Sequence, residues 1–384
     1  MILYLDECYN TGNNWNDENQ LFFTYGGWLV SEENLEKAKS IVRLFANNYQ
    51  GELKSKSFAS HKGIKKVINL SKDLISEGNA VPFFMCFEKK FMIACKAVEI
   101  FFDHKTNCKV NGYLTFPNEY EYFKIISKKN NIDAKYEDVK HLLPPIKIIK
   151  MALAETIYTD EKLCSYIGDV INNKNIEDNC VDNIINQMAN LFNEQGLEEI
   201  AQIFKSENFS TDEIYEELIG DTLIDNTKVE KSKKSILVQP SIFEMTQNLI
   251  DEYKDLELVV DTLGIQNMQF EEISKLLNIP IKVIEESEND SMIMASDLLV
   301  GHIARLIKDI VVKDDSLEDS DIELLKNIIT NKYSAFEGKS SLWYFKISQK
   351  SWNKLSDKLK YKRYINDYNK ILKNMFHQFK KGER

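Results

Sequence analysis

The stretch Met1-Ile2-Leu3-Tyr4-Leu5-Asp6-Glu7 decides the fold of this 384-residue chain, because an apolar strand ends there on two carboxylates. Short apolar runs bounded by a turn are typical of buried strands. The turn is indicated by Asn10, Thr11 and Gly12. A carboxylate at the end of such a strand lies at a sheet edge, where it is held rigidly and still meets water, metal and substrate.

Two more acids occupy comparable positions far along the chain. Asp261 ends the apolar strand predicted at 256–261, and Asp297 lies inside the apolar helix predicted at 290–310. A lone buried carboxylate costs several kcal/mol unless it is paired or bound to metal. His302 or Arg305 is an alternative partner for Asp297. Three converging carboxylates repel one another, and a hard divalent cation relieves that repulsion, so the pattern predicts a metal site.

Strand and helix patterns alternate at the two ends of the chain, while the middle is almost entirely helical in pattern. This alternation predicts an α/β fold with a mixed sheet flanked by helices. We expect Gly26 and Gly27 at a bulge, in a strand pair or one bent strand. The predicted organisation is a split core at 1–110 and 250–312, a helical insertion at 111–249, and a helical, basic C-terminal extension at 313–384. The remaining predicted strands are 81–87 and 281–284, and the clearest helices are 31–47, 61–77 and 146–158.

Composition excludes several classes of protein. No run of about 18 uncharged apolar residues is present, so no membrane helix is predicted. The acidic amino terminus does not resemble a signal peptide, and the six scattered cysteines indicate free thiols, so we expect a cytoplasmic protein. The net charge of −11 argues against non-specific coating of nucleic acid. From Lys346 to Arg384, however, twelve basic and three acidic residues give +9, which leaves −20 for the rest.

These motifs resemble a bacterial family, domain of unknown function family 3800. Its opening strand is followed by Asp-Glu-Ser-Gly-Asn and a Thr-Gly turn, and here the segment reads Asp6-Glu7-Cys8-Tyr9-Asn10-Thr11-Gly12. The Gly26-Gly27 strand and Glu52-Leu53-Lys54 are similar to the family's next strand and its Glu-x-Lys segment. Ser287 and Met294-Ala295-Ser296-Asp297-Leu298 correspond to a serine and a Gln-x-Ala-Asp-Leu helix.

The resemblance covers about 1–90 and 255–310. It implies a ribonuclease H-like fold and a bacterial setting in defence against mobile elements, including antiviral defence. The chain departs from the family at Cys8 and Tyr9, which replace Ser-Gly, and at Met294, which replaces the glutamine. These departures favour an alternative, a protein-interaction module of a defence or regulatory complex that keeps the fold and binds a protein partner through its helical insertion.

The leading prediction is a metal-dependent hydrolase, a nuclease that uses Mg²⁺ or Mn²⁺. Asp6, Asp261 and Asp297 are the predicted ligands. Glu7 or Glu52 is the additional ligand or the base, and Lys54 neutralises phosphate charge unless it is solvated surface.

Basic residues near both ends are candidate contacts to nucleic acid, RNA or DNA. The aromatic side chains between the basic residues of the tail suit stacking on single strands. They equally suit the buried stripe of an amphipathic helix, which packs on the body or on a second copy of the chain. The predicted nucleic-acid-binding residues are Lys62, Lys65, Lys66, Lys360, Lys362 and Arg363.

Overall fold

The structure, a computed structural model, describes residues 1–8, 16–17, 19–49, 53–110, 114, 123–124, 127–128, 135, 146–171, 179–219, 253, 255–261, 274–275, 277–284, 290–313, 317–330, 343–362, 367–368 and 370–373. The chain divides into two compact units. The first comprises Met1–Asn13, Asp17–Lys89 and Leu223–Arg363. The second comprises Asn14–Asn16, Lys90–Thr222 and Tyr364–Arg384.

A mixed sheet forms the centre of the first unit, in the order β5-β4-β1-β2-β3-β6. Strands β1, β2 and β3 pair antiparallel, whereas β1–β4, β4–β5 and β3–β6 pair parallel. The α/β class and the mixed sheet predicted from the sequence are therefore confirmed. The strands are β1 (Ile2–Cys8), β2 (Phe22–Val30), β3 (Val81–Glu88), β4 (Glu257–Asp261), β5 (Ile281–Ile284) and β6 (Trp343–Lys346).

Strand β1 continues further than its apolar run. Glu7 pairs with Tyr25 and Cys8 with Thr24, because β2 offers backbone partners beyond Leu5. Both acids therefore lie at the carboxyl end of β1, as the sequence predicted, and the strand ends one residue later at Cys8.

The expectation of a bulge at Gly26 and Gly27 was wrong, because β2 is one strand whose register is continuous with both neighbours. A Cβ atom on Gly27 would collide with the Tyr4 carbonyl and the Ser296 side chain. The glycine is needed for the close approach of a helix to the sheet, which depends on the tertiary packing.

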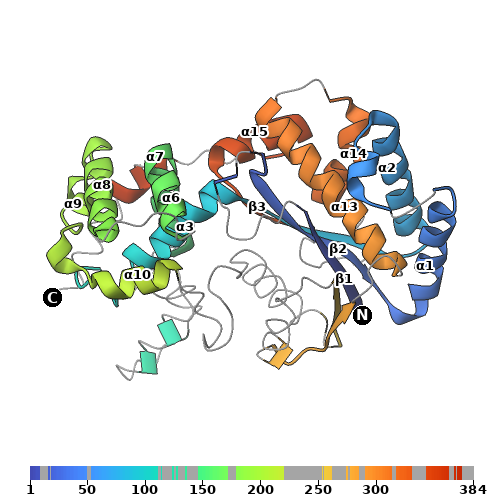
Figure 1. Ribbon diagram of the computed structural model, residues 1–384, viewed down its shortest axis with the longest axis horizontal. Coiled ribbons are helices and arrows are strands. Elements are labelled where there is room, and N and C mark those ends of the chain that lie inside the picture. Colours follow the sequence, from blue (N-terminus) through green and yellow to red (C-terminus); the bar gives the residue numbers. More distant parts are fainter. Residues whose placement is uncertain are drawn as a thin grey trace. The chain divides into compact units, whose positions relative to one another are not determined.

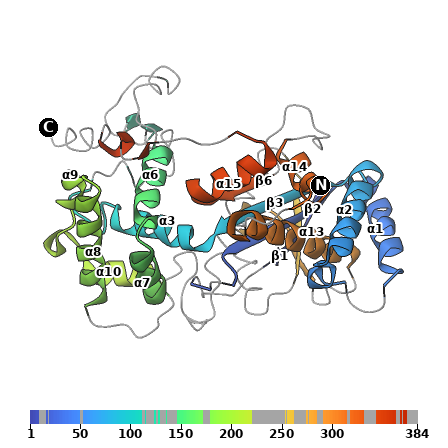
Figure 2. The same ribbon diagram turned by 90° about the horizontal axis from the view of Figure 1, so that it is seen from above.

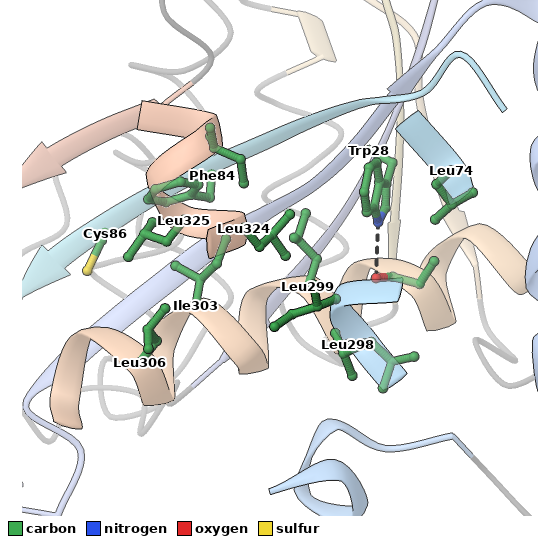
Figure 3. Close-up of a cluster of buried hydrophobic side chains, with 14 of the residues drawn as sticks. Trp28, Leu74, Phe84, Cys86, Leu298, Leu299, Ile303, Leu306, Leu324 and Leu325 are labelled. Carbon is green, nitrogen blue, oxygen red and sulfur yellow. Dashed lines mark hydrogen bonds between the residues drawn. The ribbon is translucent and has the colours of Figure 1, made fainter. Parts of the chain in front are cut away.

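Helix α13 (Ser291–Lys308) packs against β1 and β2 (Figures 1 and 2). Asp290 caps its first turn by accepting the N–H groups of Met292 and Ile293. Trp28 Nε1 donates to the Ala295 carbonyl at 3.1 Å. Figure 3 draws this hydrogen bond as the dashed line from Trp28. Around α13 lie α1 (Glu32–Ala46), the short 3₁₀ helix η1 (Ser55–Phe58), α2 (His61–Ser76), the π turn η8 (Asp309–Lys313) and α14 (Asp319–Ile329).

The C-terminal part of the first unit contains a strand that the sequence did not predict. Strand β6 pairs with β3 inside a segment expected to be helical. It is followed by α15 (Gln349–Leu359), whose Trp352 is 5% exposed and stacks on Trp343. Glu88 accepts the N–H of Ser348 at 2.8 Å and so ties α15 to the end of β3. Trp352 is therefore part of a core, as expected if the tail aromatics form the buried stripe of an amphipathic helix.

The second unit is helical in its described part and has its own core. Phe102 packs on Phe192 and Phe204, and Phe204 packs on Phe209. No described helix is long and apolar enough to span a bilayer. Figure 2 labels its α-helices, which are α3 (Lys89–Phe101), α6 (Ile146–Tyr158), α7 (Glu161–Ile171), α8 (Cys180–Glu194), α9 (Glu198–Ala201) and α10 (Thr211–Ile219). A short 3₁₀ helix, η4 (Ser206–Asn208), lies between α9 and α10 in the chain.

Candidate functional site

Two of the predicted ligands lie side by side at the carboxyl ends of parallel strands. The register of β1 and β4 pairs Tyr4 with Val259 and Leu5 with Val260. Continued by one residue, it places Asp6 beside Asp261. Both side chains point to the face on which α13 lies, because they follow Tyr4 and Val259 by two residues in their strands.

The third predicted ligand comes from α13. Ser296 Oγ donates to the Tyr4 carbonyl at 3.1 Å, which fixes the helix over β1 two residues before Asp6. Asp297 is the next residue of the helix, and its charge raises the pKa of Asp6. The fold therefore brings Asp6, Asp261 and Asp297 to one edge of the sheet from three elements.

Two hydrogen bonds between Ser55 and α13 hold this part of the helix. The Ser55 N–H donates to Asp297 Oδ2 at 2.7 Å, and Arg305 Nη1 donates to the Ser55 carbonyl at 2.6 Å. Between them, a Cβ atom on Gly301 would collide with the Ser55 side chain. Asp297, Gly301 and Arg305 are spaced by four residues, so they share one face of the helix. The backbone of η1 rests on that face.

The neighbouring carboxylates disfavour the charge of Asp6. Burial raises the pKa of Asp6 well above its ordinary value, and the charges of Glu7, Asp297 and Asp261 raise it further. A hydrogen bond from the Glu7 N–H at 2.7 Å opposes this shift. A group of acids held in this way attracts a proton or a cation.

More interactions stabilise the ionised form of Asp297 than that of Asp6. Burial raises its pKa, while the hydrogen bonds from Ser55 and the charges of Lys54 and Arg305 lower it. Lys54, predicted to neutralise phosphate charge, therefore acts on this carboxylate from the residue before η1. The same charges act on Cys8. Burial and the charge of Asp297 raise the pKa of its thiol to about 12, against the opposing charge of Arg305.

Glu7 occupies the other face of the sheet. Successive strand residues point to opposite faces, and Glu7 lies opposite Tyr25 in β2. Burial raises the pKa of the Tyr25 phenol, and the charge of Glu7 adds to the rise. Glu7 thus acts on Asp6 through its charge, whereas alternation directs its side chain away from α13. Glu52, the other predicted base, lies outside the described residues.

The donor set suits a hard divalent cation in its chemistry. Carboxylate oxygens from Asp6, Asp261 and Asp297 are the ligands that Mg²⁺ and Mn²⁺ prefer, and Mg²⁺ keeps several waters while using one or two carboxylates. Within the described ranges, no three His, Cys, Asp or Glu side chains are grouped closely enough to form a ready-made metal site.

The predicted nucleic-acid-binding lysines lie at two places of the first unit. On α2, Lys62 and Lys65 are exposed, Lys65 lies 3.9 Å from Glu318, and Lys66 lies over the Tyr49 ring. At the end of α15, Lys360 and Lys362 are exposed. Arg363 and Ser287 lie outside the described residues.

Sequence reasoning did not find Ser55 or Gly301, and it considered Arg305 only as a direct partner of Asp297. The spacing of Asp297, Gly301 and Arg305 was a usable signal, because a small residue between two charges on one helix face favours close approach of another backbone. Ser55 itself gave no signal, since its contact with Asp297 spans 242 positions.

The second unit contains a cavity of about 410 Å³. None of the predicted site residues lines it. Its walls combine apolar side chains, such as Phe102, Ile149 and Leu372, with polar and charged ones, such as Lys109, Glu199 and Lys205.

The chain was compared with protein-family models, curated proteins and solved structures, and no match was found in any of the three. The resemblance to domain of unknown function family 3800 therefore stays a prediction that rests on the short motifs at the two ends.

Proposed function

We propose that this chain is a divalent-metal-dependent phosphodiesterase, a nuclease built on a ribonuclease H-like sheet. The observation that carries the proposal is that Asp6 and Asp261 follow paired residues at the carboxyl ends of β1 and β4, while α13 packs on β1 and the charge of Asp297 acts on Asp6. The strand order, with an antiparallel β1–β2–β3 meander joined to parallel β4 and β5, supports this type of sheet.

Asp6, Asp261 and Asp297 would hold the metal ion. A bound Mg²⁺ or Mn²⁺ supplies an activated water and stabilises the leaving oxygen of the phosphodiester. Ser55 keeps Asp297 in one orientation, and Lys54 contributes positive charge beside the phosphate. The defence setting implied by the family resemblance belongs to the same proposal.

Cleavage of labelled single-stranded and duplex RNA and DNA in Mg²⁺ or Mn²⁺ tests the proposal. Asp6→Asn and Asp261→Asn should each abolish cleavage while the fold is kept. Asp73→Asn, which removes an exposed carboxylate on α2, is the matched control and should retain full activity. Activity in both site variants equal to that of the control would overturn the site.

A second candidate function is favoured by Cys8, Tyr9 and Met294, which depart from the motifs of the family that the chain resembles. On this view the chain is an interaction module that keeps the sheet and binds a protein partner through its helical unit. Metal titration separates the two functions. An ion bound at 100 times its Kd would stabilise the fold by about 2.7 kcal/mol. An unchanged Tm up to millimolar Mg²⁺ and Mn²⁺ would favour the interaction module.

A further inference from the structure

Arg305 places a bidentate donor edge beside the carboxylates. Its Nη1 is used, because it donates to the Ser55 carbonyl at 2.6 Å. Its Nε and Nη2 are both buried, and neither has a hydrogen-bond partner within the described part of the chain. These two atoms form one side of the planar guanidinium, whose parallel N–H bonds match two oxygens of a carboxylate or phosphate.

An unpaired buried donor is costly. Leaving one without a partner costs about 1–3 kcal/mol, and more when the group is charged. A guanidinium cannot lose its proton to escape this cost. The side of Arg305 that carries Nε and Nη2 is therefore poised for an anion that the described residues do not provide.

The position of Arg305 shows where this anion would come from. The residue lies on the same face of α13 as Asp297, two turns further along, and both contact Ser55. Its charge acts on Cys8, two residues after Asp6 in β1. The free edge therefore belongs to the site of Asp6, Asp261 and Asp297. Arg305 as a whole is only partly buried, although its Nε and Nη2 atoms are buried.

We propose that the Nε–Nη2 edge of Arg305 binds two non-bridging oxygens of a substrate phosphate, so that the site selects phosphate esters over neutral esters. This inference rests on the proposed function and adds a phosphate-binding residue to it. Three acids repel an approaching phosphate, and a fixed guanidinium with two paired donors offsets that repulsion at a defined place.

The test measures binding without turnover. A labelled oligonucleotide is titrated in EDTA by fluorescence anisotropy, on the Asp6→Asn background, at two salt concentrations. That background prevents cleavage and removes one repelling charge. Arg305→Lys keeps the charge and a donor for Ser55 but loses the edge, so affinity should fall about tenfold with little change in salt dependence. Arg305→Gln should also reduce the salt slope by about one.

The matched controls are Arg43→Lys and Arg43→Gln, which make the same changes on exposed α1 and should leave affinity unchanged. A purely structural Arg305 would lower the Tm and leave the affinity of the folded fraction unaltered, which would overturn the inference. Inorganic phosphate gives a second readout, since it should raise the Tm of the Asp6→Asn protein but not that of the protein with Arg305→Lys added.

The two proposals fail in different ways. If no metal supports cleavage but Arg305→Lys weakens binding in EDTA, hydrolysis is overturned and the phosphate edge stands. If Mg²⁺ supports cleavage but Arg305→Lys binds the oligonucleotide as tightly as its parent, the phosphate edge is overturned and hydrolysis stands.

Discussion

Asp297 and Ser55 are joined by a hydrogen bond of 2.7 Å from the backbone N–H of Ser55 to the carboxylate, across 242 positions of sequence. The bond ties the proposed site to η1, which is followed directly by the lysine-bearing helix α2. It also satisfies a half-buried carboxylate that would otherwise be costly to hold near other acids. The orientation of Asp297 therefore depends on how closely η1 can approach α13.

Gly301→Ala tests that dependence. The new methyl group would collide with the Ser55 side chain, so overpacking should cost about 1–3 kcal/mol, although alanine favours a helix more than glycine does. Any cleavage activity should fall as well, because Ser55 moves away from Asp297. Chemical denaturation and the cleavage assay measure the two effects. The double variant Gly301→Ala/Ser55→Gly removes the colliding atoms and should recover most of the stability. If it is no more stable than the single variant, the contact with Ser55 is not the cause.

Asp6→Asn should stabilise the metal-free protein. The folded-state pKa of Asp6 is raised above its ordinary value. The free energy of unfolding therefore falls as the pH rises from the pKa of Asp6 in the unfolded chain to its pKa in the folded chain. Removing the charge should raise the free energy of unfolding at neutral pH by about 0.5–2 kcal/mol. The same variant should lose the stabilisation that Mg²⁺ or Mn²⁺ gives to the unaltered chain. Thermal melts with EDTA and with metal measure both effects, with Asp73→Asn as the control. A destabilised metal-free Asp6→Asn protein would contradict the electrostatic account.

His302 should make the protein less stable in mild acid. Burial, together with the charge of Arg305, lowers the pKa of this imidazole from 6.5 to about 4. Below pH 6.5 the unfolded chain takes up a proton that the folded chain refuses until about pH 4. His302 therefore does not lower the free energy of unfolding above pH 6.5. As the pH falls to about 4, this group alone lowers the free energy of unfolding by roughly 3 kcal/mol.

Urea denaturation at several pH values checks the effect of His302. His302→Leu should flatten the slope between pH 6.5 and 4, whereas His104→Gln, at a half-exposed position, should leave it as it is. Equal slopes in the two variants would show that other groups cause the acid sensitivity.

The basic tail should separate into a structural part and a surface part. Trp352→Ala should cost about 3–5 kcal/mol, because the indole is buried and stacked on Trp343. Lys360→Gln/Lys362→Gln should leave stability within about 0.5 kcal/mol, since both side chains are exposed. If these lysines track a backbone of phosphates, the double variant also lowers the salt slope of oligonucleotide binding by about two. An unaltered slope would remove them from the proposed interface.

Local patterns sufficed for several elements of the fold. The predicted helix at 146–158 is α6, and the predicted strand at 281–284 is β5, because the length and the boundaries of each apolar run indicate the element. Strand β6 was missed, because four residues inside a basic segment carry no period, and their pairing with β3 depends on a partner 259 positions earlier at Phe84 and Trp343. A short edge strand is decided by its neighbour.

The sequence by itself determined which carboxylates end apolar elements, and this is a local property of Asp6, Asp261 and Asp297. Only the tertiary structure decided how they are held. The parallel register of β1 and β4 places Asp6 beside Asp261, and the approach of η1 to Gly301 fixes Asp297 and leaves the Nε–Nη2 edge of Arg305 open. Which side chains are buried and how they alternate along a strand can be predicted from nearby residues in the sequence. Register, close approach and the satisfaction of buried donors depend on residues hundreds of positions away, which no local pattern reports.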